Sequence, residues 1–197
     1  MCQNFAVHAG GALTLAANNI QNGDVGASSA ITWAAAVIEA REYIAISSVF
    51  AAETLDRHAA AIAPRVNARS LDTLEMGGIT FTTGTYHANG GLLVTSGIVV
   101  LDGRGNVNSV FFFQVISLTA AAGTSILELV NGAKAENVSW ALNTAFTVGT
   151  GSFLEGSVLV RTTTVAAGRQ MRGCVISTGD ITFGAGGWIN RPQLSVW

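Results

Sequence analysis

"FTVGTG" at residues 146–151, "TTVAAG" at 163–168 and "ITFGAG" at 181–186 decide the fold of this chain. The copies begin 17 and then 18 residues apart, and each has threonine in its second place. Because side chains alternate between the two faces of a strand, the residues beside each threonine point inward and the threonine points outward. A strand that returns at such a short, steady interval predicts a parallel β-solenoid, in which every coil contributes one copy.

The frame of an apolar residue, threonine, an apolar residue and a small residue recurs elsewhere in the chain, with one imperfect copy at Thr163. We predict that these threonines and their small partners form the outward face of the solenoid. The candidate site residues are Thr14, Ala16, Thr80, Thr82, Thr119, Ala121, Thr147, Gly149, Thr164, Ala166, Thr182 and Gly184. Glycine or asparagine follows each small residue after one intervening residue, and both accept the positive φ of a corner. These corner residues are Asn18, Gly84, Gly123, Gly151, Gly168 and Gly186.

Other predicted strands of the coils have a different hydrophobic pattern. "VFFFQVI" (110–116), "SVLV" (157–160) and "CVIS" (174–177) are apolar on both alternations, which is typical of strands covered on both faces. The cover is predicted to be one helix over about residues 48–63, ended by Pro64, that packs on Phe112, Leu159 and Val175 or Ile176. Its predicted apolar stripe, at helical spacing, is Val49, Ala52, Leu55, Ala59 and Ile62. Residues 27–47 fit a strand or a helix equally well.

Composition limits the function. Charged residues make up 11% of the chain, against about 25% in ordinary globular proteins. The net charge of −2 leaves no basic surface for nucleic acid and no polybasic segment for a membrane. No apolar run is long enough to span a bilayer, and the length fits a single domain over residues 1–197. The first residues do not form a signal peptide. Met1 either replaces a removed leader or is a natural start.

The titratable residues do not indicate a reactive centre. His8, His58 and His87 have no cysteine or histidine at metal-ligand spacing. The aspartates lie at or near turns, where their side chains bond the backbone. We therefore expect no metal, no cofactor and no enzyme activity. Cys2 and Cys174 either form one disulfide or are two buried thiols, and we expect two free thiols.

The outward face is the candidate site. Coils stack about 4.8 Å apart, so the threonines would form a flat column at that spacing. Each hydroxyl can hold a water molecule, and the adjacent methyl group restricts where that water lies. Such a plane orders water. The alternative is an ordinary strand surface, because threonine is a good strand residue. The low charge favours a function.

Three stretches carry a resemblance to a known family: "LDGRGNVNSVFFFQV" (101–115), "LVNGAKAENVSWAL" (129–142) and "TVGTGSFLEGSVLV" (147–160). Together with "FAVHAGGALTLAANNIQNGDVGAS" (5–28), they resemble the microbial ice-binding proteins of the DUF3494 type. The resemblance implies a discontinuous right-handed β-solenoid of triangular cross-section with a long helix alongside. It also implies secretion and adsorption to ice through one flat face, which gives thermal hysteresis and inhibits recrystallisation. The resemblance leaves the oligomeric state open, and we expect a monomer. Residues 29–47 fall where members of that family carry a variable cap.

Two rival functions use the same scaffold. A carbohydrate-binding or adhesive solenoid would present aromatic platforms on the flat face, and Trp33, Trp140, Trp188 and Trp197 lie outside the repeat. A polysaccharide-cleaving solenoid would need a groove of acids and arginine, and the repeat places threonine, alanine and glycine outward instead. A second column after the corners, Thr85, Thr124, Ser152 and Arg169, is the alternative ice face, and the charge of Arg169 counts against it.

Overall fold

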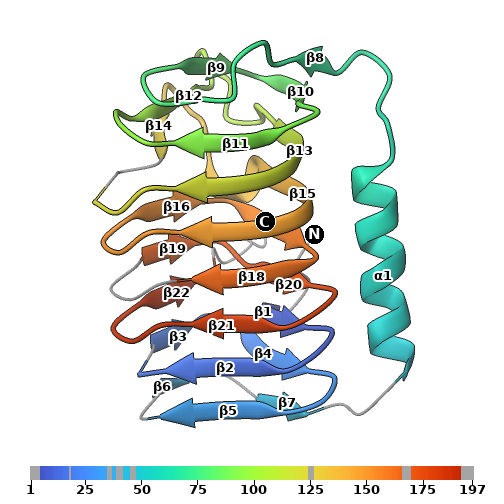
Figure 1. Cartoon of the computed structure of the whole chain (residues 1–197). Coiled ribbons are helices and arrows are strands. Elements are labelled where there is room, and N and C mark those ends of the chain that lie inside the picture. Colours follow the sequence, from blue (N-terminus) through green and yellow to red (C-terminus); the bar gives the residue numbers. More distant parts are fainter. Residues whose placement is uncertain are drawn as a thin grey trace.

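The chain winds into coils of short strands around an apolar core, with one α-helix outside them (Figure 1). The computed structural model describes residues 5–17, 19–34, 37–38, 42–44, 48–123, 127–165 and 170–191. Within these residues the strands pair in parallel and in register, as stacked coils require. The prediction of a mainly β protein built from parallel coils is confirmed.

One side of the coils, here called the threonine face, is a continuous sheet of seven strands (Figure 1). In stacking order they are β5 (Ile31–Ala34), β2 (Leu13–Ala16), β21 (Ile181–Phe183), β18 (Thr162–Val165), β15 (Val138–Val148), β13 (Phe111–Ala120) and β11 (Gly91–Val94). The long strands β13 and β15 continue around a corner onto the next side. The register between them shifts between Val115 and Ser117, where the corner lies.

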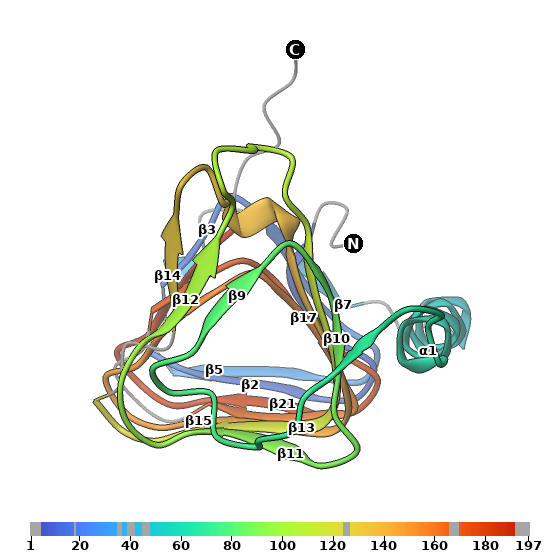
Figure 2. The ribbon, with the colours of Figure 1, turned by 90° about the horizontal axis from the view of Figure 1, so that it is seen from above.

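The second side carries the helix α1 (Ser48–Ile62) on its outer surface (Figure 2). Its strands are β7 (Glu42–Ile44), β4 (Asp24–Ala27), β1 (Phe5–Ala9), β20 (Val175–Ser177), β17 (Ser157–Val160), the first halves of β15 and β13, β10 (Gly84–His87) and β8 (Arg69–Ser70).

The third side consists of two separate sheets. The three-stranded sheet holds β14 (Leu127–Val130), β12 (Val99–Asp102) and β9 (Thr80–Thr82). The five-stranded sheet holds β16 (Phe153–Glu155), β19 (Gln170–Arg172), β22 (Trp188–Asn190), β3 (Asn19–Gln21) and β6 (Val37–Ile38). A short 3₁₀ helix, η1 (Ala135–Asn137), precedes β15.

The coils do not stack in the order of the sequence. Strands β1 to β7 form the coils at one end, α1 then runs along the stack, and the chain resumes at the opposite end (Figure 1). The last coil returns to the first, so that β20 pairs with β1, β21 with β2 and β22 with β3. The segment that fitted strand or helix equally well forms strands at 31–34, 37–38 and 42–44, which add an end coil.

The helix lies where the sequence predicts it, but a different stripe is buried. Its residues Ala61 and Ile62 pack with Phe112, Leu159 and Ile176, so the predicted cover is confirmed. Leu55, however, is 55% exposed. The buried stripe is Thr54, His58 and Ala61, because the sheet offers polar partners as well as apolar ones. Val49 and Ala52 lie outside the side chains that the structure describes.

The expectation of two free thiols is wrong. Cys174 is buried and disulfide-bonded, and Cys2 is the only other cysteine of the chain. The sequence analysis named the disulfide as the alternative but did not favour it, because the two cysteines are far apart in the sequence. The return of the last coil to the first places the start of β1 beside β20, with Val7 opposite Val175.

Candidate functional site

A single column of threonines runs across the threonine face. Its residues are directly opposite one another from strand to strand, and each threonine is exposed. In stacking order the column is Thr32, Thr14, Thr182, Thr164, Thr147, Thr119 and Leu93. The structure therefore brings together five of the six threonines that the frame selects, and it adds Thr32.

Thr80 is not part of this column. It lies on β9, where it pairs with Val100 in the three-stranded sheet of the third side. Thr82, its partner in the frame, accepts a hydrogen bond from Arg69 Nη1 through its own hydroxyl, at 3.3 Å. The frame misplaced both residues because an alternating strand suits any side of a coil. In that coil the threonine face is formed by β11 instead.

Thr32 was not among the predicted site residues, although its strand repeats the whole frame. Ile31-Thr32-Trp33-Ala34 repeats the frame, but it falls in the segment that fitted strand or helix equally well. Its pairing with Thr14 and the pairing of Ala34 with Ala16 extend the face by one coil. Trp33 is 43% exposed because β5 is the end strand, with no further coil over its inward side.

The columns beside the threonines are built from small residues. On one flank the backbone N–H groups of Ala121, Gly149 and Gly184 donate to carbonyls of the neighbouring coil at 2.7–2.9 Å. These residues are small and partly exposed, and Ala16 continues this flank. A Cβ at Gly149 would meet the backbone of the Ala121–Ala122 segment, so glycine is required there. Ala166 lies outside the described residues.

The opposite flank is formed by Gly91, Ser117, Ala145 and Thr162, which are in register. At the corner beside this flank, threonine hydroxyl groups donate hydrogen bonds to the neighbouring coil. Thr144 Oγ1 donates to the carbonyl of Ile116 at 2.9 Å, and Thr162 Oγ1 donates to the carbonyl of Thr144 at 3.2 Å. Three adjacent coils are thus tied together at this edge, and the face is held as a rigid plane.

The alternative column after the corners does not form among the described residues. Thr85 lies on β10, on the helix side. Ser152 is buried, and its hydroxyl donates to the carbonyls of Gly149 and Ala121 at 2.9 and 3.0 Å. Thr124 and Arg169 lie outside the described residues. The corners themselves are as predicted at Gly123, Gly151 and Gly186, whose φ values are 73°, 75° and 76°.

Charge is scarce on the threonine face. Asp180 directly precedes β21, and its Oδ1 accepts the Ala12 N–H at 2.7 Å, while Glu75 pairs with Leu93 at the other end of the threonine column. At the β11 end, Thr95 Oγ1 donates to Glu75 at 2.7 Å. Partial burial acts to raise the pKa of Glu75, but hydrogen bonds from Thr95 and Gly77 outweigh it, and the pKa is lowered. Both carboxylates are therefore turned toward backbone and hydroxyl donors.

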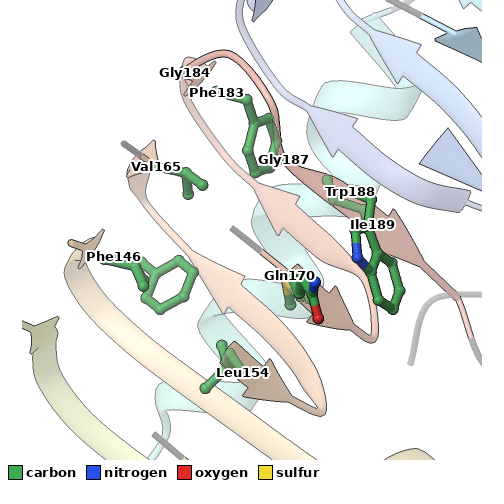
Figure 3. A pocket seen from close by; sticks show the side chains of 11 residues that line it. Phe146, Leu154, Val165, Gln170, Phe183, Gly184, Gly187, Trp188 and Ile189 are labelled. Carbon is green, nitrogen blue, oxygen red and sulfur yellow. The ribbon is translucent and has the colours of Figure 1, made fainter. Parts of the chain in front are cut away.

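The described residues hold no centre for a metal ion and no helix for a membrane. They contain no group of three or more His, Cys, Asp or Glu side chains placed to hold a metal ion. No helix among them is long and apolar enough to cross a bilayer. Behind the face, Phe146, Val165 and Phe183 line an apolar cavity of about 20 Å³ (Figure 3). A cavity that is this small and apolar has no room for a ligand, so the exposed plane is the candidate site.

Curated relatives match part of the chain. An "Ice-binding protein" of Nostoc sp. (strain HG1) is 35% identical over 94 residues, which are 48% of this chain and 34% of that protein. "Ice-binding protein 1" of Shewanella frigidimarina (strain NCIMB 400) is 34% identical over 86 residues, 43% of this chain and 10% of that protein. The matched segments thus span a third or less of the length of these two relatives.

A solved structure matches almost the whole fold. The crystal structure of an ice-binding protein from the Antarctic ascomycete Antarctomyces psychrotrophicus superposes with a TM-score of 0.87 at 28% identity, covering 98% of this chain and 97% of that one. The family model described as "Ice-binding-like" matches residues 4–187. Since that match takes in most of the sequence, the chain belongs to the Ice-binding-like family.

Proposed function

We propose that the threonine face adsorbs to the surface of ice crystals, so that the protein gives thermal hysteresis and inhibits recrystallisation. The observation that carries this proposal is the unbroken column of six exposed threonines on six adjacent strands. The names of the relatives and of the similar crystal structure support it, because each is an ice-binding protein.

The mechanism is one of ordered water. Strand spacing places the hydroxyls about 4.8 Å apart along the column. Each hydroxyl both donates and accepts a hydrogen bond, so it can hold one water molecule, while the methyl group beside it limits where that water lies. Small flanking residues keep neighbouring waters in the same plane. Adsorption then rests on many weak contacts made together, and it needs no cofactor and no reaction.

The other features of the proposal concern the whole molecule. We infer a secreted monomer, folded as a single domain over residues 1–197. The disulfide of Cys174 supports an extracytoplasmic location, because disulfides persist in oxidising compartments. We also infer a right-handed solenoid of triangular cross-section with α1 along one side. The view along the coil axis, in which strands follow three sides, supports that shape (Figure 2).

One bulky side chain in the plane tests the proposal. Thr147→Tyr and Thr164→Tyr should each remove most of the thermal hysteresis, because a tyrosine ring holds the plane away from the ice lattice. Thr80→Tyr is the matched control, since Thr80 is an exposed strand threonine on another side. All three substitutions should change the free energy of unfolding by no more than about 0.5 kcal/mol.

Hysteresis and thermal melts should be measured on all three variants and on the wild-type protein. Full hysteresis in Thr147→Tyr and Thr164→Tyr, together with unchanged melts, would show that the threonine face does not contact ice. Equal loss in Thr80→Tyr would point to a site on the third side. A wild-type protein that leaves single ice crystals unshaped would overturn the function itself.

A further inference from the structure

The five-stranded sheet presents a surface unlike the threonine face. Two columns of residues, in register, occupy the outward alternation of its strands. The first, here called the aromatic column, is Phe153, Gln170 and Trp188, with Asn19 opposite Trp188. The polar column is Glu155, Arg172, Asn190 and Gln21. We propose that this surface binds a neutral saccharide chain, with the sugar rings stacked on the aromatic column and their hydroxyls bonded to the polar column.

The aromatic column provides the stacking surface. Leu154 and Ile189 point into the core, so their neighbours Phe153 and Trp188 take the outward alternation, and both are partly exposed. Figure 3 shows the Trp188 ring and the Gln170 amide side by side on adjacent strands. Phe153 and Trp188 lie two strand spacings apart, about 9.6 Å. Two platforms at this separation favour an extended ligand that reaches both.

The polar column provides hydrogen-bond donors and acceptors. It lies two residues along the strands from the aromatic column, about 7 Å away. Asn190 Oδ1 accepts from Asn22 Nδ2 at 2.9 Å, and Asn190 Nδ2 donates to Gln21 Oε1 at 3.5 Å, at the limit of a hydrogen bond, so Asn190 Nδ2 and the Gln21 amide keep capacity for a ligand. The Arg172 guanidinium, 57% exposed, also donates. A ligand rich in hydroxyl groups satisfies donors and acceptors alike.

Glu155, at one end of the polar column, offsets the charge of Arg172. It is 7% exposed, and its Oε2 has no hydrogen-bond partner among the described residues. Its other oxygen lies 3.9 Å from Arg172, so the two charges offset each other and the surface favours a neutral ligand.

A hollow continues this surface beyond the edge of the sheet. It encloses about 580 Å³ between the two sheets of the third side, and Phe153, Gln170, Leu127 and Glu128 line it. β14 and β16 end their respective sheets there, so the two sheets do not join. The hollow is open to solvent and partly polar, and its volume lies within the range of small-molecule sites. The hollow can take the end of a chain that lies along the aromatic column.

The probe is cellohexaose, a straight β-1,4-linked chain, with maltohexaose, its coiled α-1,4-linked isomer, as the control of shape. Isothermal titration of the whole chain should detect cellohexaose and not maltohexaose. Trp188→Ala and Phe153→Ala should each weaken binding roughly tenfold or more, because aromatic anchors dominate such contacts. Trp33→Ala, an exposed tryptophan on another side, is the matched control and should bind as the wild-type protein does.

The outcomes separate this inference from ice adsorption. Trp188→Ala and Phe153→Ala should retain full hysteresis, because both residues lie off the threonine face. Thermal melts of both variants should show a cooperatively folded protein. Absence of cellohexaose binding, or binding that survives both substitutions, would overturn the saccharide site and leave the ice proposal untouched. Equal binding of maltohexaose would overturn the straight-chain ligand. Loss of both activities in a folded variant would overturn the separation of the two surfaces.

Discussion

The N-terminal coils (residues 5–44) and the C-terminal coils (residues 69–191) share one strand pattern but are held in place differently. In the C-terminal coils, strands pair with those of the coils directly before and after, as β15 does with β13, β17 and β18. The N-terminal coils dock on the last C-terminal coil instead, through β1 with β20 and β2 with β21. The Ala12–Asp180 contact at this junction joins residues 168 apart in sequence.

The difference shows why the junction carries additional ties. Closing a long loop costs conformational entropy before any contact forms. Side chains offset that cost: Asp180 accepts the Ala12 N–H at 2.7 Å, and Asn22 Nδ2 donates to Asn190 Oδ1 at 2.9 Å. The disulfide of Cys174 adds a covalent tie. Two of the six threonines of the column, on β2 and β5, therefore depend on long-range docking.

Removing the disulfide should have the largest effect on how firmly the N-terminal coils are held to the C-terminal coils. Cys174→Ser should lower the free energy of unfolding by about 2–5 kcal/mol, the usual range for a disulfide that closes a long loop. Hydrogen exchange should show protection lost first in β1 to β4, because those strands lose their covalent tie. Urea denaturation with and without reductant measures the stability, and reductant should not affect the variant.

The wild-type protein supplies the control for this experiment. Thiol titration of the denatured, unreduced protein should find no free thiol. Two free thiols, or a variant as stable as the wild type, would mean that the junction does not depend on the bridge. Uniform loss of protection across all coils would mean that the two regions unfold as one unit.

The helix joins the two regions, and its two buried polar residues can be separated. His58 Nε2 donates to the carbonyl of Leu142 at 2.8 Å, in the stretch of β15 between its pairings with β17 and β18. Thr54 hydrogen-bonds His8 of the N-terminal coils at 3.2 Å. His58→Leu should lower the free energy of unfolding by about 1–3 kcal/mol, because a buried carbonyl loses its donor.

Thr54→Val is the matched variant on the same helix. It should cost less, because the lost bond is longer and joins two side chains, and it should raise hydrogen exchange chiefly in β1. Thermal melts and exchange on both variants give the comparison. Faster exchange in β1 after His58→Leu, with β15 unchanged, would contradict the division of the helix into two contacts.

Sequence patterns predicted the fold because the fold repeats. Alternation and a regular interval are local signals, so the coils, the corners and the position of α1 follow from them. The stacking order does not. Nothing local indicates that β2 follows β21, and free thiols were therefore expected in place of a disulfide at Cys174. The buried stripe of α1 was also wrong, since Thr54 and His58 are buried only because the sheet offers them partners.

The candidate site was predictable to the same extent. The frame identified the threonines that pair across β2, β21, β18, β15 and β13. It could not tell which side of a coil a strand would take, and so it included Thr80. Thr32 was within reach, because its segment repeats the frame in full. The large planar residues of the five-stranded sheet follow no period, and only the register brings Phe153 and Trp188 into one column.

Glu155 tests the packing of the C-terminal coils alone. Burial raises the pKa of this carboxyl group; Arg172 lowers it in part, and Glu136 adds to the rise. Because the pKa is higher in the folded state than in the unfolded state, folding favours the protonated carboxyl group. The free energy of unfolding is therefore highest at acid pH and falls as the pH rises through the folded-state pKa. Glu155→Gln should remove this decline and raise the free energy of unfolding at pH 7 by about 1–2 kcal/mol. Melts from pH 4 to 8 measure it, and a decline that persists in the variant would contradict the assignment.

Thr163 and Thr164, neighbours on β18, give the smallest effect and the sharpest contrast. Thr163 takes the inward alternation between Phe146 and Ile181, is 3% exposed, and has an Oγ1 with no hydrogen-bond partner among the described residues. Thr163→Val keeps the shape and removes the unpaired hydroxyl, so it should raise the free energy of unfolding by up to about 1 kcal/mol and leave hysteresis unchanged.

Thr164→Val makes the same chemical change on the outward alternation. The hydroxyl that it removes faces solvent, so stability should stay within about 0.5 kcal/mol of the wild type, while hysteresis falls. Melts and hysteresis on the two variants resolve the roles of adjacent residues. If Thr163→Val is destabilising, its hydroxyl has a partner in solution. If Thr164→Val retains full hysteresis, the methyl groups and the flat backbone of the face, rather than its hydroxyls, hold the ordered water.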